Sequence, residues 1–289
     1  MYNKAMKAIL VKSFTQNRDE GNPAGVVLNA NALSDEKILA ITRDLGFGES
    51  AFLQSPANDA DYLLRLFSVE GEVNSCATAT IAAAYILFSD ILKSKEHITF
   101  QTKLGNIKVF KKHDGSIFIG LPPVQFIPSL VEIHRDEIAK LLAIDENKIA
   151  DFPIEIASIG TPKLLIPIKT LEDLFAIKPN LDAIAEYCKK SGARGFYPFT
   201  LETKKAKSDF HTRQFNPLAG IAEDPVTGVA AGALAGYLKK YKILDKEKYI
   251  GEQGYVINSP GEIVVRTTKN TTYVGGFAVM YGEKDLKES

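Results

Sequence analysis

The pattern of hydrophobic and polar residues singles out two stretches of the chain that contain no charged side chain. Residues 77–88 read ATATIAAAYILF, and residues 229–238 read VAAGALAGYL. A helix at a protein surface needs a polar face, and neither stretch has one, so both helices should be enclosed on all sides. Their small residues would let other backbones approach closely. We therefore predict two buried central helices.

Both stretches are introduced by short polar residues, which are VNSC at 73–76 and EDPVTG at 223–228. Proline at an early helical position with a carboxylate beside it is typical of a helix start, so the second helix should begin close to Pro225. Aligning Ala77 with Gly228 brings Leu87 onto Leu238 without a gap. Alternating segments precede both copies, at 62–67 and 210–215. This similarity predicts an internal duplication, with chance likeness between two Ala-rich helices as the alternative.

The remaining pattern predicts strands and amphipathic helices around these two centres. Expected strands in the first half are 8–14, 24–28, 62–67, 98–102, 105–112 and 116–121. Surface helices are expected at 34–45, 131–142 and 181–191. In the second half, strands are expected at 154–158, 163–168, 195–200, 210–215, 254–258, 262–267 and 273–281. The proline-rich segment 121–128 predicts a boundary between domains 1–122 plus 275–289 and 127–272.

Composition narrows the function classes. The 289 residues include 35 Lys and Arg and 35 Asp and Glu, so no basic excess exists for nucleic acid or an anionic membrane. No apolar run reaches the length of a membrane span, and the N-terminal residues lack the apolar core of a signal peptide. Two cysteines give no disulfide framework and favour a cytoplasmic protein. The four histidines have no metal-ligand spacing, and no GxGxxG follows a predicted strand, so neither a metal nor a nicotinamide cofactor is expected.

The two helix starts are candidate anion sites. Unpaired backbone N–H groups and the positive end of the helix dipole lie at a helix N-terminus. A small carboxylate-bearing molecule would suit such sites, although both starts could instead be ordinary capped ends. The thiol of Cys76 could be activated there, but a two-thiol racemase needs a partner at the matching position, which holds Thr227. Cys188 is expected in a surface helix, so Cys76 is more simply a buried residue.

Two acidic residues are candidates for proton transfer. Glu49 lies in the apolar segment GFGESAFL at 46–53, and burial there would raise its carboxyl pKa toward neutrality. The alternative for Glu49 is a turn carboxylate that caps a backbone N–H. Asp224 could act as a second acid or could cap its helix.

Several motifs together resemble the PhzF-like family, the relatives of the phenazine-biosynthesis isomerase with a diaminopimelate epimerase-like fold. The matching segments run through nearly the whole chain in the family's order. They are GNPA at 21–24, GESAF at 48–52, EVNSCATAT at 72–80, RQFNP at 213–217, GIAEDPVTG at 220–228, EQG at 252–254 and SPG at 259–261.

The resemblance implies an α/β (α+β) fold of two pseudo-symmetric domains, each a curled, mostly antiparallel sheet around a central buried helix. It also implies an active site in the cleft between the domains, no cofactor and a homodimer. The characterised isomerase moves a proton on dihydrohydroxyanthranilate with the glutamate that matches Glu49, and the EDP aspartate matches Asp224 as a second catalytic residue. Positions near the substrate match Asn22, Cys76, Ala77, Thr78, Thr227, Gly228 and Val229.

The sequence departs from the family pattern at two of these positions. The family's Gly-His-Ala-Thr is ATAT at 77–80, so Thr78 stands in place of an active-site histidine, and Val229 replaces a serine. Threonine does not titrate near neutrality, so the phenazine reaction itself is not expected. The hypothesis is a cofactor-independent isomerase or epimerase that moves a proton on a small carboxylate-containing metabolite. The alternative is a catalytically inactive member that binds a metabolite or a protein partner.

Overall fold

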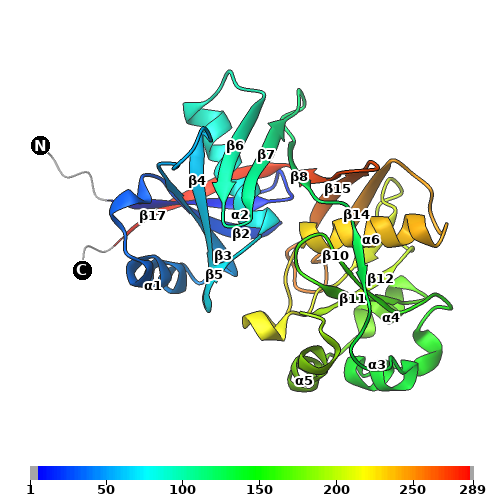
Figure 1. Ribbon diagram of the computed structural model, residues 1–289. Coiled ribbons are helices and arrows are strands. Elements are labelled where there is room, and N and C mark those ends of the chain that lie inside the picture. Colours follow the sequence, from blue (N-terminus) through cyan, green and yellow to red (C-terminus); the bar gives the residue numbers. More distant parts are fainter. Residues whose placement is uncertain (1–5, 287–289) are drawn as a thin grey trace, which may run out of the picture. The chain divides into compact units, whose positions relative to one another are not determined.

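The structure is a computed structural model that describes residues 6–286. The chain forms two compact units: unit 1 runs to Gly120 and resumes at Gly275, and unit 2 comprises Leu121–Val274. Figure 1 shows their helices and strands, with sequence position given by colour.

Unit 1 contains most of the strands of the first half and the last strand of the chain. Its elements are β1 (Lys7–Ser13), β2 (Asn22–Val27), α1 (Asp35–Leu45), β3 (Glu49–Gln54), β4 (Tyr62–Ser68), β5 (Gly71–Val73), α2 (Ala77–Ile86), β6 (His97–Thr102), β7 (Gly105–Lys111), β8 (Ile117–Leu121) and β17 (Ala278–Asp285), with a 3₁₀ turn at Ala30–Ala32 and a π-helical turn at Leu87–Ile91.

Unit 2 repeats the same kind of construction. Its elements are β9 (Gln125–Ile127), α3 (Arg135–Leu142), β10 (Glu155–Ser158), β11 (Lys163–Pro167), α4 (Leu171–Ala176), α5 (Leu181–Ser191), β12 (Phe196–Thr200), β13 (Phe210–Thr212), α6 (Gly228–Lys240), β14 (Lys248–Gln253), β15 (Gly261–Thr267) and β16 (Thr272–Gly276), which contains the boundary to unit 1, with 3₁₀ turns at Glu146–Lys148 and Pro217–Ala219.

Strand pairing within residues 6–286 is mostly antiparallel in both units, and both units also contain parallel pairs. In unit 1 the parallel pairs are β2 with β3 and β4 with β6. In unit 2 they are β11 with β12 and β13 with β14. Parallel neighbours need a crossover connection. The first pair of each unit is bridged by outer helices, which are α1 in unit 1 and α4 with α5 in unit 2. The second pair is bridged by the central helix, α2 or α6. This shared order supports the predicted duplication.

The two uncharged stretches form buried helices, as predicted. Nine of the ten residues of α2 are buried, and the buried residues of α6 run from Gly228 to Leu238 with one interruption at Gly236. Close packing explains the glycines of α6, because a Cβ added to Gly232 would lie 2.3 Å from Ile159 Cδ1. At Gly236 it would lie 2.4 Å from Val124 Cγ2. These approaches require residues without a side chain.

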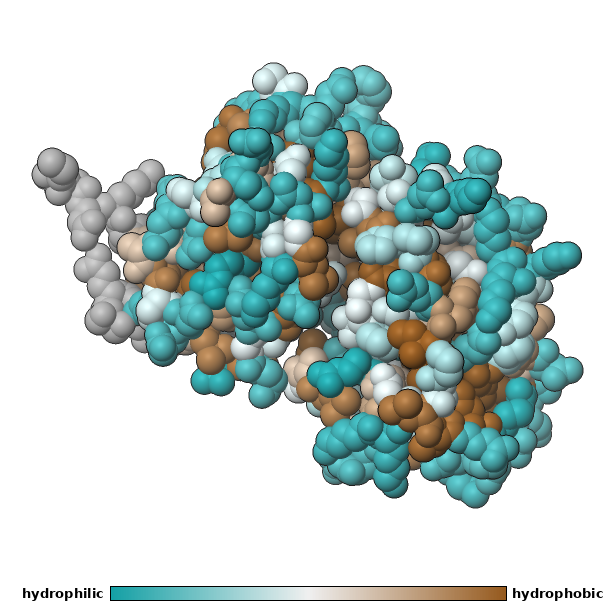
Figure 2. Space-filling view, in the orientation of Figure 1, coloured by the Kyte–Doolittle hydropathy of each residue, from teal (hydrophilic) through white to brown (hydrophobic). Residues whose placement is uncertain are grey.

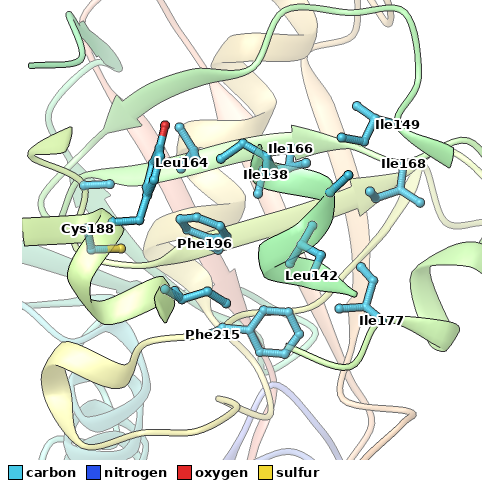
Figure 3. Close-up of a cluster of buried hydrophobic side chains, with 14 of the residues drawn as sticks. Ile138, Leu142, Ile149, Leu164, Ile166, Ile168, Ile177, Cys188, Phe196 and Phe215 are labelled. Carbon is cyan, nitrogen blue, oxygen red and sulfur yellow. The ribbon is translucent and has the colours of Figure 1, made fainter. Parts of the chain in front are cut away.

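A second hydrophobic core in each unit lies between the sheet and the outer helices. In unit 1, Ile38 and Leu45 of α1 pack with Phe52 and Phe67 of the sheet. Helix α1 begins after Ser34, whose hydroxyl accepts a hydrogen bond from the Lys37 N–H. In unit 2, side chains of α3 and α5 meet residues of β11 and β12, and Figure 3 shows this cluster around Phe196.

The structure corrects three predicted strands. Residues 254–258 form turns rather than a strand, because Gly254 has a φ of +89° and its carbonyl accepts a hydrogen bond from the Ser259 N–H. The strand expected at 210–215 ends at Thr212 and continues only as an isolated bridge between Phe196 and Phe215. The strand expected at 273–281 is interrupted at Phe277, whose carbonyl accepts hydrogen bonds from the N–H groups of Phe14 and Thr15.

One local expectation is also wrong. Helix α6 begins at Gly228 after the N-cap residue Thr227, so Pro225 lies in the preceding loop rather than at an early helical position. Cys188 lies in the amphipathic helix α5, as predicted, on the face that is buried in the core shown in Figure 3. Burial raises the pKa of the Cys188 thiol to about 11, so this thiol stays protonated near neutrality.

The surface is predominantly hydrophilic with local hydrophobic areas, as Figure 2 shows for one face. One apolar groove of about 250 Å³ lies in unit 2 and is lined by Phe126, Ile127, Pro128, Ser129, Ile133, Ile154, Glu155 and Ile156. None of the predicted site residues lines it. Among residues 6–286, no helix has the length and apolar character needed to span a membrane.

Candidate functional site

Strand register in unit 1 places several polar side chains on the face of the sheet that packs against α2. Ser13 pairs with Asn22 across β1 and β2, and Ala24 pairs with Glu49 across β2 and β3. Paired residues point to the same face of a sheet, and residues two apart on one strand do so as well. Ser13, Asn22 and Glu49 therefore share one face. The neighbouring pair Gly25 and Ser50 points to the opposite face, toward Leu45 of α1.

The first turn of α2 is bound to this face by two hydrogen bonds. The Asn22 amide donates to the Thr78 hydroxyl over 3.2 Å, and the Ser13 hydroxyl donates to the Thr78 carbonyl over 2.9 Å. All three residues are buried. The Thr78 hydroxyl oxygen accepts from Asn22, and a hydroxyl also carries one hydrogen that it can donate. Thr78 is thus a neutral group at a position where the resemblance to the family implies histidine.

Cys76 is the N-cap residue of α2, as the predicted helix start requires. Its thiol sulfur accepts a hydrogen bond from the Ala79 N–H over 3.4 Å, and its carbonyl accepts one from the Thr80 hydroxyl over 2.7 Å. Cys76 and Ala77 are both buried. The sulfur thus satisfies one of the backbone donors that a helix N-terminus leaves unpaired. The hydrogen bond from the Ala79 N–H gives the Cys76 thiol a structural role.

Glu49 is the first residue of β3, between Ala24 of β2 and Ser68 of β4. Its neighbours Ala24, Ser50 and Ala51 are fully buried, but Glu49 itself is only half-buried. Complete enclosure of this carboxylate, which the apolar sequence context suggested, is therefore not observed. A half-buried carboxylate on an otherwise buried face can contact a ligand from solvent.

In unit 2, the loop that carries Asp224 is fixed by a buried arginine. Arg213 donates to Glu223 through Nε and Nη2, at 2.9 and 2.7 Å, and through Nη1 to the carbonyl oxygens of Leu174 and Ile177. The Asp224 N–H donates to the Gln214 carbonyl over 2.9 Å. The RQF motif therefore holds the EDP motif in place through these hydrogen bonds.

The N-cap residue of α6 is Thr227 rather than Asp224. The Thr227 hydroxyl donates a hydrogen bond to the Asp224 carboxylate and makes no side-chain cap of its own helix. Gly228 and Val229, in the first turn, are buried, while Asp224 and Thr227 are half-buried. The start of α6 therefore differs from the start of α2, where Cys76 does cap the helix.

A buried amide connects Asp224 and Thr227 to the interior of unit 2. Gln253 Nε2 donates to the Asp224 carbonyl over 2.7 Å and to Thr227 Oγ1 over 3.0 Å. Gln253 Oε1 accepts from the Thr227 N–H over 3.2 Å and from the Tyr197 hydroxyl over 3.2 Å, and the Thr212 hydroxyl lies 3.1 Å from it. Burial, and then the negative charge of Asp224, raise the pKa of Tyr197, which keeps the phenol protonated as a donor.

The structure thus gathers the predicted residues into two groups. Asn22, Cys76, Ala77 and Thr78 adjoin one another in unit 1, where Glu49 shares the face that carries Asn22. Asp224, Thr227, Gly228 and Val229 form the second group in unit 2. From the sequence, Gln253 is visible only as part of the EQG motif, and Ser13 not at all. Within residues 6–286, no group of three or more His, Cys, Asp or Glu could hold a metal ion.

Comparison with known proteins relates this arrangement to one family. The family model described as phenazine biosynthesis-like protein (PhzC-PhzF) matches residues 11–284. An uncharacterized isomerase of Bacillus subtilis, YfhB, is 34% identical over 268 residues, covering 91% of this chain and 90% of that protein. A crystal structure of a Bacillus anthracis phenazine biosynthesis protein of the PhzF family is 28% identical, with a TM-score of 0.90, and the match covers 99% of this chain and 100% of that one.

A more distant structure extends the likeness of fold. A hydroxyproline epimerase from Agrobacterium vitis, solved with trans-4-hydroxy-L-proline, has a TM-score of 0.68 at 13% identity, with 98% of this chain and 91% of that chain covered. The predicted fold class, a mixed α/β fold of the diaminopimelate epimerase-like type, is confirmed. The relatives are isomerase-like and epimerase-like proteins.

Proposed function

Because this chain belongs to the phenazine biosynthesis-like (PhzC-PhzF) family, we propose that it is a cofactor-independent isomerase or epimerase that moves a proton on a small carboxylate-containing metabolite. Glu49 is the proposed general acid/base. A side chain in this role removes a proton from carbon and returns it at the same or another position.

The observation that carries this proposal is the position of Glu49. Its carboxylate is half-buried at the start of β3, on the sheet face whose neighbouring residues Ser13 and Asn22 hold the first turn of α2. A base needs to reach its substrate while most bulk water is kept away, and a half-buried carboxylate among buried residues meets both needs.

Two further features fit a small anionic substrate. The N-cap residue of α6, Thr227, makes no side-chain cap, and the positive end of a helix dipole favours a carboxylate. We propose that the starts of α2 and α6 bind the substrate carboxylate. Asp224, which accepts a hydrogen bond from the Thr227 hydroxyl, would orient an amino or hydroxyl group of the substrate.

Thr78 and Val229 argue for a substrate other than dihydrohydroxyanthranilate. The Thr78 hydroxyl is neutral and already accepts a hydrogen bond from Asn22, so it cannot transfer a proton as histidine can. Val229 offers an apolar side chain. These same residues favour the alternative that the chain only binds a metabolite or a protein partner. The retained Glu49 favours catalysis.

The test is a thermal-shift panel of small amino and hydroxy acids, followed by solvent deuterium exchange on each acid that stabilises the protein. The panel includes dihydrohydroxyanthranilate and trans-4-hydroxy-L-proline. A ligand at a hundredfold its Kd stabilises the folded state by about 2.7 kcal/mol. We expect deuterium incorporation at carbon with the wild type and none with Glu49→Gln. A fully active Glu49→Gln protein would contradict the role of Glu49 as general acid/base. Binding of an acid without deuterium exchange would favour the alternative that the protein only binds its ligand.

We further propose that the protein is a homodimer. The resemblance to the family is its support, and light scattering on the purified chain is its test. A monomer at micromolar concentration would refute this proposal without affecting the role of Glu49.

A further inference from the structure

Five side chains in unit 2 form a continuous series of hydrogen bonds that ends on the Asp224 carboxylate. The series runs from Thr212 through Tyr197, Gln253 and Thr227 to Asp224. Gln253, Tyr197 and Thr212 are buried, and Gln253 is fully excluded from solvent. The series therefore links residues that are distant in sequence to Asp224, the one charged side chain among the five.

The number of hydrogens available fixes the direction of the bonds that Gln253 and Thr227 make with each other and with Asp224. The Thr227 oxygen accepts from Gln253 Nε2, so its single hydrogen goes to Asp224. Gln253 Oε1 has no hydrogen and must accept, which matches the donors Tyr197 and the Thr227 N–H. The Tyr197 hydroxyl donates to Gln253, and the Thr212 hydroxyl carries one hydrogen, which can go to Tyr197, to Gln253 Oε1 or to the Glu252 carbonyl. Reversing the Gln253 amide would set its NH₂ against the N–H donor of Thr227.

We propose that Gln253 is a positioning residue for Asp224, and that Tyr197 and Thr212 act by holding the Gln253 amide in its orientation. The amide fixes the Asp224 backbone through its carbonyl and fixes the Thr227 hydroxyl hydrogen on the Asp224 carboxylate. Gln253 itself need not touch the substrate. The consequence for catalysis rests on the proposed function, whereas the arrangement of the series does not.

The chain offers a matched control for this proposal. Gln214 is also a buried glutamine in unit 2, and its backbone carbonyl accepts the Asp224 N–H, but its side-chain amide forms no hydrogen bond among the described residues. Gln214→Met and Gln253→Met make the same chemical change on two neighbours of Asp224. Only Gln253→Met removes donors and an acceptor from the series.

The first experiment uses the ligand-free protein, labelled with ¹³C at threonine methyl groups. We expect Gln253→Met to move the Thr227 methyl resonance, Tyr197→Phe to move it in the same direction by less, and Gln214→Met to leave it in place. Thr227→Ser identifies the resonance by its loss. If Gln253→Met does not fold, the Thr227 resonance of Tyr197→Phe alone tests the proposal. An unmoved Thr227 resonance in the folded variants would overturn the proposal whatever the activity.

The second experiment measures deuterium exchange on the panel acid that the wild type labels fastest. We expect Gln253→Met to lower kcat on the order of tenfold or more with a smaller change in KM, because misplacing a substrate-orienting group impairs the reacting geometry. Adding Tyr197→Phe to Gln253→Met should lower kcat no further. Additive losses, or equal losses in Gln214→Met, would overturn the proposal. If Glu49→Gln is fully active, the proposed function fails while the resonance shifts still decide the role of Gln253.

Discussion

The Arg213 guanidinium and the Glu223 carboxylate form a bidentate ion pair within unit 2, with N–O distances of 2.9 and 2.7 Å. The remaining donor of Arg213 binds the carbonyl oxygens of Leu174 and Ile177. Glu223 directly precedes Asp224, so this pair fixes the approach of the chain to its proposed catalytic residue.

Breaking this pair should destabilise the protein strongly. Glu223→Gln leaves a buried guanidinium without its counter-charge, which typically costs about 3–5 kcal/mol. The control is Glu186→Gln, which removes an exposed pair with Lys189 and should change the free energy of unfolding by less than about 0.5 kcal/mol. Urea denaturation at pH 7 measures both. Equal effects of the two variants would show that the Arg213 pair contributes no more than a surface contact.

Glu252 should make the stability depend on pH in the acidic range. Burial by itself raises the pKa of Glu252, but hydrogen bonds from His211 and from the backbone N–H groups of Lys204 and Lys205 lower it to about 2, against 4.5 as its ordinary value. A lowered folded-state pKa stabilises the protein above the unfolded pKa, here about 4.5, and this contribution is lost as the pH falls toward 2.

The shift in the Glu252 pKa corresponds to about 3 kcal/mol, at 1.36 kcal/mol per pKa unit. We expect wild type to exceed Glu252→Gln in free energy of unfolding at pH 7, and the difference to shrink below pH 4.5. Urea denaturation at pH 7, 4 and 3 is the measurement. A difference that stays constant over this range would contradict the assigned pKa.

Gly232→Ala should destabilise α6, although alanine is normally better than glycine in a helix by about 1 kcal/mol. The added Cβ would lie 2.3 Å from Ile159 Cδ1 and 2.9 Å from Val274 Cγ2. Overpacking of this kind costs about 1–3 kcal/mol. Ile159→Val removes the closest atom, so it should cost less in the Gly232→Ala background than alone. Thermal unfolding of the two single variants and the double variant tests this coupling.

Cys76→Ser should keep the stability of unit 1, since serine is a favoured N-cap residue and its oxygen can accept from the Ala79 N–H as the sulfur does. Cys76→Ala removes that acceptor and should cost about 1 kcal/mol. If the protein catalyses deuterium exchange, Cys76→Ser should retain it. Loss of exchange in a stable Cys76→Ser protein would instead assign chemistry to the thiol.

The sequence predicted well those features that depend on local pattern. The uncharged stretches predicted α2 and α6, and apolar residues at helical spacing predicted α1. Predictions failed where tertiary contacts override the pattern. The residues at 254–258, which were predicted as a strand, form turns around Gly254, and the strand predicted at 273–281 is interrupted at Phe277.

What the sequence by itself determined is the family, the fold class and the set of candidate residues, because motif order and hydrophobic periodicity are properties of the chain in one dimension. The tertiary structure alone decided which atoms these residues contact. The bonds from Asn22 to Thr78, from Arg213 to Glu223 and from Gln253 to Thr227 join segments 10 to 56 residues apart. Such partners are set by strand register and by the demand that buried polar groups be hydrogen-bonded, and both arise only when the chain has folded.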